Sequence, residues 1–319
     1  MRDSSVALCV PAFNAAALLP RLFDSVSRQG VPFDELWVYD DASTDRTADV
    51  AAQCGARVVQ GQVNKGCSAG KNALLMQVGA SWVHFHDADD TLAPEFVKRA
   101  KARIQRDTFD VLLFNYEQVE ERSGQQMSRS QFEATDVRTA PVRYMLSNTV
   151  NNGGVYAVDL LRRVGGFDED PAVRYNEDRA FHLRLAEAGA AFEVDPYVGS
   201  RFYFNAGSMS SANRVRCLRA HSEITRRFAR RHPDGYEREI GRLSWQDAGG
   251  LASFLDWREA DACVRLAIRH GARVPEEAGA LFRSLARIHP LWALRIREHL
   301  IRWFKPRFRA GYPVKAASE

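Results

Sequence analysis

The sequence has 319 residues, of which 45% are hydrophobic and 26% charged, enough to build a core for one large domain or two small ones. Its 44 lysines and arginines exceed its 40 aspartates and glutamates by four, an excess too small to indicate nucleic acid as a partner. The five cysteines form no Cys-x-x-Cys pair, and no apolar run has the length of a membrane span or the form of a signal peptide. We therefore expect a cytoplasmic globular protein without a zinc or redox centre.

Short apolar runs alternate with helix-like segments over the first third of the chain. Strands are predicted at residues 6–10, 36–39, 57–60, 82–85 and 111–114, and helices at residues 16–28, 46–53, 68–78 and 94–106. The predicted strands are apolar throughout rather than at alternate residues, which is typical of a parallel sheet buried on both faces. The pattern predicts a doubly wound, Rossmann-like α/β fold with helices flanking a mostly parallel sheet.

The pattern changes after residue 115. Longer and more polar strands and loops are predicted at residues 116–132, 153–158 and 192–204, with a helix at residues 177–188, and this favours a mixed edge of the sheet. From about residue 213 the chain is predicted to be helical and is rich in arginine, and the polar stretch 205–211 indicates a boundary near Ser211. We expect one domain at residues 1–211, divided into halves at 1–115 and 116–211, and a helical region at 212–319.

Acidic clusters follow two of the predicted strands. Ligands of an open parallel sheet bind beyond the carboxyl ends of its strands, so the residues at these ends are the candidate site. Asp87 and Asp89, two positions apart behind a buried strand, can direct oxygens at one Mg²⁺ or Mn²⁺ ion, and such an ion would neutralise a diphosphate. The alternative is helix capping near Pro94, for which Asp90 is suited. The second acidic loop nearby favours the metal site.

That second acidic loop begins with Asp40 and Asp41. One of these carboxylates can accept hydrogen bonds from a nucleobase or ribose, although the same residues are also common in turns. A glycine-containing segment at residues 64–72 opens the next helix, where backbone amides and Lys71 can meet a phosphate. The first strand lacks a following Gly-x-Gly-x-x-Gly, which argues against a nicotinamide or flavin dinucleotide.

A third acidic pair, Glu177 and Asp178, starts the helix predicted at residues 177–188. Acidic residues are favoured in a first helical turn by the helix dipole alone, which is the structural alternative. The turn formed by residues 165–169 would bring this helix start to the same edge of the sheet. A carboxylate there could take a proton from an acceptor hydroxyl.

Four blocks of the sequence, in this order, resemble the inverting glycosyltransferases of family 2, which use nucleotide sugars and have the GT-A fold. The blocks are Val10-Pro11-Ala12-Phe13-Asn14, Tyr39-Asp40-Asp41-Ala42-Ser43-Thr44-Asp45, His86-Asp87-Ala88-Asp89-Asp90, and Gly165-Gly166-Phe167-Asp168-Glu169 followed by Glu177-Asp178. The resemblance covers roughly residues 5–211. Each block is common alone, and the specificity comes from finding all four in order.

The resemblance implies a role for each of these residues. Asp178 would be the catalytic base, which deprotonates the acceptor while the acceptor oxygen attacks the anomeric carbon, and Asp87 and Asp89 would hold Mn²⁺ or Mg²⁺. The donor-binding residues would be Pro11, Ala12, Phe13, Asn14, Asp40, Asp41, Asn64, Gly66, Lys71, Asp87, Ala88 and Asp89, and the acceptor side would include Asn152 and Glu177.

Two departures from the family pattern bear on these roles. Lys71 stands where the family usually has arginine, so the charge is kept but the bidentate fork is lost. Ala42 stands where glycine is commoner, which argues against a left-handed backbone at that position.

The resemblance implies a metal-dependent transferase that moves a sugar from a UDP-sugar to a glycan or lipid-linked acceptor in bacterial surface polysaccharide synthesis. The alternatives are a nucleotide-sugar-binding protein without turnover and a nucleotidyltransferase.

The end of the chain leaves two interpretations open. Residues 293–319 carry seven lysines and arginines against two glutamates, and Trp292, Ile296, Leu300 and Trp303 fall on one helical stripe. Such a helix can lie at the inner face of a membrane, which would suit a lipid-linked acceptor. Its commoner role is to pack the stripe on the catalytic domain.

Overall fold

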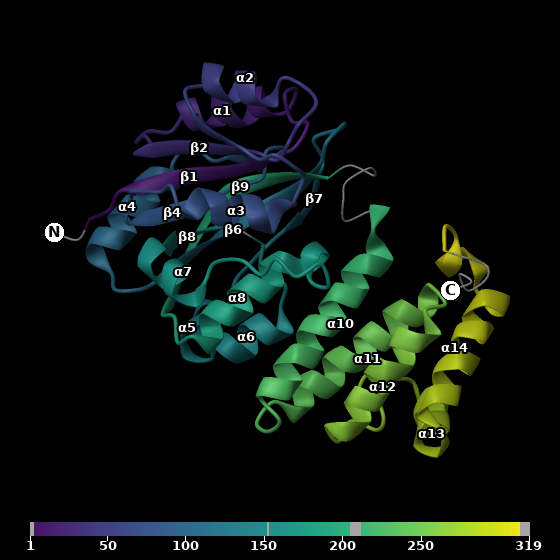
Figure 1. Cartoon of the computed structure of the whole chain (residues 1–319). Helices are drawn as coiled ribbons and strands as arrows, with labels where there is room; N and C mark the ends of the chain where they lie inside the picture. The colour runs from purple at the N-terminus through teal and green to yellow at the C-terminus, as the bar shows by residue number, and fades with distance from the viewer. Residues whose placement is uncertain (1–2, 152, 205–211, 313–319) are drawn as a thin grey trace. The chain divides into compact units, whose positions relative to one another are not determined.

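The computed structural model describes residues 3–151, 153–204 and 212–312 (Figure 1). The chain divides into two compact units, one made of Met1–Glu169 and Glu177–Ser211 and the other of Asp170–Asn176 and Ala212–Glu319. Residues 170–176, which lie before the boundary expected from sequence, therefore group with the helical unit.

One mixed sheet of nine strands organises the described part of the first unit. The strands are β1 (Val6–Ala12), β2 (Glu35–Asp40), β3 (Arg57–Gln60), β4 (Trp82–Phe85), β5 (Thr91–Leu92), β6 (Val111–Glu120), β7 (Gln126–Arg129), β8 (Gly154–Ala157) and β9 (Phe192–Phe204). Their order is β3-β2-β1-β4-β8-β6-β9-β5, with β7 beside β6. Neighbours from β3 to β4 are parallel, as are β6 and β9, whereas β8 runs antiparallel to both of its neighbours.

Helices flank this sheet, as the sequence predicts (Figure 1). They are α1 (Leu19–Ser27), α2 (Thr47–Gln53), α3 (Cys67–Leu75), α4 (Phe96–Arg106), α5 (Ala134–Thr139), α6 (Pro141–Ser147), α7 (Val158–Val164) and α8 (Glu177–Glu187). The core lies between sheet and helices, where Val6, Leu8 and Val10 of β1 and Phe96 of α4 are fully buried. Each such side chain contributes about 1.5–3 kcal/mol by leaving water.

The topology explains why polar loops meet at one edge. The chain moves from β1 outward to β2 and β3 and then returns to β4 on the other side of β1, so the strand order reverses between β1 and β4. Backbone hydrogen bonds fasten the loops at this point: Asp41 N donates to Ala12 O at 2.8 Å, and His86 N donates to Cys9 O at 3.0 Å. The carboxyl ends of β1, β2 and β4 therefore form the expected crevice edge.

The second unit is helical in its described residues, as predicted. It consists of η1 (Arg174–Asn176), α10 (Arg214–Arg231), α11 (Glu237–Ser253), α12 (Trp257–Arg269), α13 (Ala280–Ile288), α14 (Pro290–Phe304) and η2 (Pro306–Arg309). Its own core gathers Trp245, Leu251, Val264 and Leu294. Across the described residues, no helix combines the length and the apolar character that crossing a bilayer requires.

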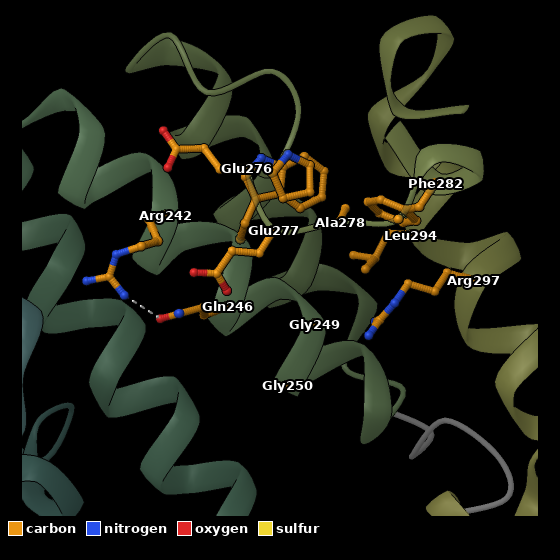
Figure 2. A pocket seen from close by; sticks show the side chains of 13 residues that line it. Arg242, Gln246, Gly249, Gly250, Glu276, Glu277, Ala278, Phe282, Leu294 and Arg297 are labelled. Carbon is orange, nitrogen blue, oxygen red and sulfur yellow. Dashed lines mark hydrogen bonds between the residues drawn. The ribbon is translucent and has the colours of Figure 1, made fainter. Parts of the chain in front are cut away.

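A pocket of about 490 Å³ opens in this helical unit (Figure 2). It lies between α11, the loop at residues 275–279, α13 and α14. Arg242 donates to Gln246 on one side of it, and the Arg297 guanidinium lies 5.9 Å from the centre of the Phe282 ring on the other.

Candidate active site

The loops that follow β1 and β2 are interlocked by hydrogen bonds. Asn14 Oδ1 accepts from Thr44 N at 2.8 Å, and Asn14 N donates to Ser43 Oγ at 2.9 Å. Pro11 and Ala12 are the last residues of β1, and the ring of the adjacent Phe13 is half exposed at this edge. The first two blocks of the resemblance thus form one structure.

Ala42 has a left-handed backbone, with φ of 59°. The sequence-based expectation for this position is therefore wrong. An alanine in this conformation costs roughly 1–2 kcal/mol, and the surrounding hydrogen bonds hold it there. Ala42 N donates to Asp40 O at 2.9 Å, and Ser43 N donates to Asp40 Oδ1 at 3.0 Å.

Asp40 and Asp41 are both buried, but they differ in their remaining hydrogen-bonding capacity. Both oxygens of Asp41 accept from backbone amides, from Lys65 N at 2.8 Å and from Gly66 N at 2.7 Å. Gly66, with φ of 92°, leads directly into α3, so Asp41 fixes the start of that helix. Asp40 uses only Oδ1, and within the described residues its Oδ2 accepts no hydrogen bond. Asp40 is therefore the better placed of the two to meet a ligand.

The loop after β4 presents carboxylates of a different kind. Among the described residues, the side chains of Asp87 and Asp89 form no hydrogen bond or ion pair with another side chain, and Asp87 is exposed. Although water reaches Asp87, the protein atoms around its carboxyl group desolvate it and raise its pKa. Desolvation also raises the pKa of Asp89, and the charge of Asp87 raises it further. Ala88, between them, is buried.

Asp90 is a structural residue in this loop. It is buried and accepts a hydrogen bond from Tyr203 N of β9 at 2.8 Å. The capping role considered for it is wrong, because α4 begins at Phe96 and Glu95 occupies the capping position.

The Asp87 and Asp89 pair suits a cation that is held partly by its substrate. Within residues 3–151, 153–204 and 212–312, no group of three or more His, Cys, Asp or Glu side chains is arranged to hold a metal. Mg²⁺ in nucleotide sites commonly takes one or two protein carboxylates and fills its other positions with phosphate oxygens and water. Two neighbouring carboxylates that form no ion pair in the described chain fit that donor set.

Lys71 and Asp178 form an ion pair across the site, with Nζ and Oδ1 3.2 Å apart. The side chain of Lys71 is only 1% exposed, whereas that of Asp178 is 22% exposed. Burial alone would lower the pKa of Lys71, but the carboxylates of Asp178, Asp87 and Glu177 raise it well above its usual value. The ammonium group also lies 4.9 Å from the centre of the Phe167 ring. Lys71 is thus directed at Asp178.

The structure therefore brings together acidic residues from distant parts of the sequence. The charge of Asp178 raises the pKa of Asp87, so the two carboxyl groups lie within electrostatic reach. Glu177 is buried beside them, and desolvation, followed by the charge of Asp178, raises its pKa to about 7. Asn64 is exposed near the start of α3, and Asn152 lies outside the described residues.

A turn before α8 is held by a residue for which the sequence predicted no role. The Asn72 side chain accepts from Phe167 N at 2.7 Å and donates to Phe167 O at 3.0 Å and to Glu169 Oε1 at 2.7 Å. Gly166 has φ of 66°, and a Cβ at this position would collide with Asn72 Oδ1. The one sequence signal for this role is the position of Asn72 next to Lys71.

A buried histidine, His182, lies in α8 and contacts the start of that helix. His182 donates through Nδ1 to the backbone carbonyl oxygen of Asp178 at 2.8 Å and accepts through Nε2 from the Tyr156 hydroxyl at 2.9 Å. Burial lowers the pKa of His182 to about 4, so the ring is neutral at pH 7. Its place one helical turn after Asp178 is the pattern that could have revealed it.

Residues 7–162 match the sequence model of glycosyl transferase family 2. This region, just under half of the chain, is a glycosyl transferase family 2 region. The blocks at the ends of β1, β2 and β4 lie within this matched region, as does Lys71, which pairs with Asp178 beyond the end of the match.

Relatives extend the likeness beyond the family region. The chain is 25% identical over 268 residues to the succinoglycan biosynthesis protein ExoO of Rhizobium meliloti, covering 78% of this chain and 75% of that protein. It is 29% identical over 161 residues to the poly(ribitol-phosphate) beta-N-acetylglucosaminyltransferase TarS of Staphylococcus aureus, covering 48% of this chain but only 27% of TarS.

Solved structures share the architecture. Residues 1–349 of S. aureus TarS in complex with UDP-GlcNAc align with a TM-score of 0.67 at 21% identity, over 98% of this chain and 93% of that one. The mannosyltransferase PcManGT of Pyrobaculum calidifontis, in complex with GDP-Man and Mn²⁺, aligns with a TM-score of 0.58 at 20% identity, over 97% of this chain and 85% of that one. The GT-A fold expected from the sequence is confirmed.

Proposed function

We propose that this chain is an inverting glycosyltransferase that transfers a sugar from a UDP-sugar to a hydroxyl group. The observation that carries the proposal is the cluster of Asp178, Lys71 and Asp87 at the strand ends of a family 2 fold. This cluster combines a base, Asp178, with a buried cation, Lys71, and a solvent-exposed carboxylate, Asp87. A purely structural ion pair does not need the third group.

In the proposed reaction, Asp178 takes the proton from the acceptor hydroxyl. The acceptor oxygen forms its bond to the anomeric carbon on the face opposite the diphosphate. The bond between the anomeric carbon and the diphosphate oxygen breaks, and its electron pair leaves with the diphosphate. The configuration at the anomeric carbon is thereby inverted. Lys71 acts as a positioning residue, because its buried ammonium group holds the Asp178 carboxylate 3.2 Å away. Glu177 would border the acceptor. Asn152, which lies outside the described residues, is proposed for the acceptor side from the sequence alone.

The donor would lie along the loops after β1, β2 and β4. Pro11, Ala12, Phe13, Asn14 and Asp40 would surround the nucleobase and ribose. The loop at Asn64 and the first turn of α3, which follows Gly66, would face the phosphates, since the Lys65 and Gly66 amides themselves donate to Asp41. Asp87 and Asp89 would hold Mn²⁺ or Mg²⁺. A divalent ion bound there neutralises the negative charge that develops on the diphosphate. The Mn²⁺ in the PcManGT complex supports this choice, and the UDP-GlcNAc in the TarS complex supports a UDP-sugar.

The names of the relatives support a glycan acceptor. One is a succinoglycan biosynthesis protein and the other acts on poly(ribitol-phosphate), so we propose a role in bacterial surface polysaccharide synthesis on the cytoplasmic side of the membrane. A lipid-linked acceptor would bring the enzyme into peripheral contact with that membrane.

A panel of UDP- and GDP-sugars tests the proposal. We expect one donor to release nucleoside diphosphate with Mn²⁺, and EDTA to stop the release. The Asp178→Asn variant should lose the release, and Asp159→Asn, a matched change at an exposed acid in the first turn of α7, should keep it. Donor binding without release would favour a nucleotide-sugar-binding protein, and release of pyrophosphate from a nucleoside triphosphate would favour a nucleotidyltransferase.

A further inference from the structure

Exposed apolar side chains are concentrated at the end of the helical unit. Of the twelve large hydrophobic residues exposed in the described chain, eight belong to α13, α14 and η2. They are Leu281, Ile288, Trp292, Ile296, Leu300, Trp303, Phe304 and Phe308. Trp303 is 79% exposed and Phe304 71% exposed. This is far more apolar surface than scattered single residues explain.

The two sides of α14 differ in what they contact. At 100° per residue, Trp292, Ile296, Leu300 and Trp303 share one side of the helix. Leu294 and Glu298 lie on the opposite side and are buried, and Leu294 belongs to the core of the unit. The helix thus already packs its inner side, and the stripe predicted from the sequence is left outside.

Within α13, α14 and η2 the charges are almost all positive, whereas two exposed acids, Glu276 and Glu277, stand in the loop before α13. Residues 280–312 contain eight lysines and arginines and one acid, Glu298. Glu298 is fully buried and paired with Arg302 at 2.9 Å and Arg309 at 2.7 Å, and Arg295 pairs with Asp261 at 2.7 Å. Arg297 lines the pocket of Figure 2. The exposed cations Arg283, Arg287, Lys305 and Arg307 remain, with no exposed acid among the described residues of this segment.

We infer that α13, α14 and η2 form a docking surface for an anionic lipid bilayer. A second copy of the chain would bring cations against cations, whereas anionic lipid complements them. Tryptophan and phenylalanine suit the boundary between headgroups and acyl chains, and flanking lysine and arginine suit the headgroups. The use of this surface rests on the proposed function, because docking would bring the enzyme to the membrane that holds a lipid-linked acceptor. Binding to lipid itself does not depend on turnover.

Vesicle flotation of the full chain tests the docking surface. We expect binding to vesicles of phosphatidylglycerol and phosphatidylcholine in equal parts, much weaker binding to phosphatidylcholine alone, and weaker binding as salt is raised. Trp303→Ser with Phe304→Ser should weaken binding at least about ten-fold by removing apolar contact. Lys305→Gln and Arg307→Gln should each weaken it about five-fold.

A matched control separates this surface from general stickiness. Met76→Ser with Met127→Ser, which removes two exposed apolar side chains from the first unit, should bind vesicles as the unaltered chain does. All these variants should keep the unaltered thermal midpoint and the same release of nucleoside diphosphate in solution, so that loss of docking and loss of transferase activity are measured separately. Equal vesicle binding by the Trp303 and Phe304 variant would overturn the inference, as would a stable dimer by light scattering that this variant dissociates.

Discussion

Two acidic loops, which follow the two strands on either side of β1, use the same residue type in opposite ways. In the loop after β2, Asp41 gives both oxygens to backbone amides and Asp40 gives one. In the loop after β4, Asp87 and Asp89 have no such partners among the described residues, and desolvation raises the pKa of both. Similar acidic sequence patterns thus have opposite effects. The hydrogen bonds of the carboxylates stabilise the fold in the loop after β2, and the repulsion between the carboxylates destabilises it in the loop after β4.

This difference supports the proposed ligand site in the loop after β4. A hydrogen bond to a charged group stabilises a protein by about 1.5–3 kcal/mol, so the contacts of Asp41 explain its presence without any substrate. Two mutually repelling carboxylates stabilise nothing by themselves, and such groups gather at functional sites. The comparison predicts that changes in the first loop affect folding and that changes in the second affect binding.

The largest effect is expected for Asp178→Asn. Removing a general base slows catalysis by about 10²–10⁴-fold, so we expect transfer to fall about 10³-fold while donor affinity changes little. In this variant the buried Lys71 ammonium group still interacts electrostatically with Asp87 and Glu177, so the fold should be preserved. Single-turnover kinetics and calorimetry with the donor measure the two quantities. Turnover close to that of the unaltered enzyme would remove Asp178 from the role of base.

The next effect concerns the loop after β2. Asp41→Ala removes two hydrogen bonds to backbone amides and should lower the free energy of unfolding by about 3 kcal/mol, measured by urea denaturation. Asp49→Ala, at an exposed position in α2, is the control and should change it by less than about 0.5 kcal/mol. An Asp41→Ala protein with the stability of the unaltered protein would contradict the structural role assigned to the loop after β2.

Asp89→Ala should show the reverse pattern. We expect affinity for the donor in Mn²⁺ to fall about 30-fold, or about 2 kcal/mol, and affinity in EDTA to stay the same. The unfolding free energy should be unchanged or slightly raised, because repulsion from Asp87 is relieved. Calorimetry with and without Mn²⁺ makes this measurement. Equal Mn²⁺-dependent affinity in both proteins would exclude Asp89 as a metal ligand.

The smallest effect is a pH dependence of stability at Glu177. Its pKa is raised from 4.5 to about 7, so the folded protein holds a proton between these values that the unfolded chain has released. This contribution to stability is complete below about pH 4.5 and is lost as the pH rises through 7. Glu177→Gln should therefore be more stable than the unaltered protein at pH 8, whereas at pH 4.5 the two proteins should be equally stable. Urea denaturation at both values, with Glu277→Gln as an exposed control, tests the sign.

Much of the fold follows from local sequence patterns. The apolar runs place β1, β2 and β4 within a few residues, because buried strands need continuous apolar residues. The strands β3 and β9, which are more polar and only partly buried, also lie at the expected residues. The insertion of antiparallel β8 between β4 and β6 has no such signal, since strand order depends on contacts distant in the chain.

The site shows the same division. Block patterns indicated Asp87 and Asp178 separately, but the ion pair of Lys71 with Asp178 joins residues 107 positions apart. The left-handed backbone of Ala42 also runs against local preference, and it is held by hydrogen bonds from the neighbouring loop residues. Spacing in the sequence does not report such contacts.

The contact between the Asn72 side chain and the turn at Gly166 restricts how the sequence of this protein can evolve. Since a Cβ at position 166 would occupy the space of the Asn72 amide, neither position can drift alone. Gly166→Ala would collide with Asn72, and even beside a smaller residue at 72 it would keep the strain of a left-handed backbone. A helix 95 residues away in sequence thereby restricts which mutations the entrance to α8 can accept.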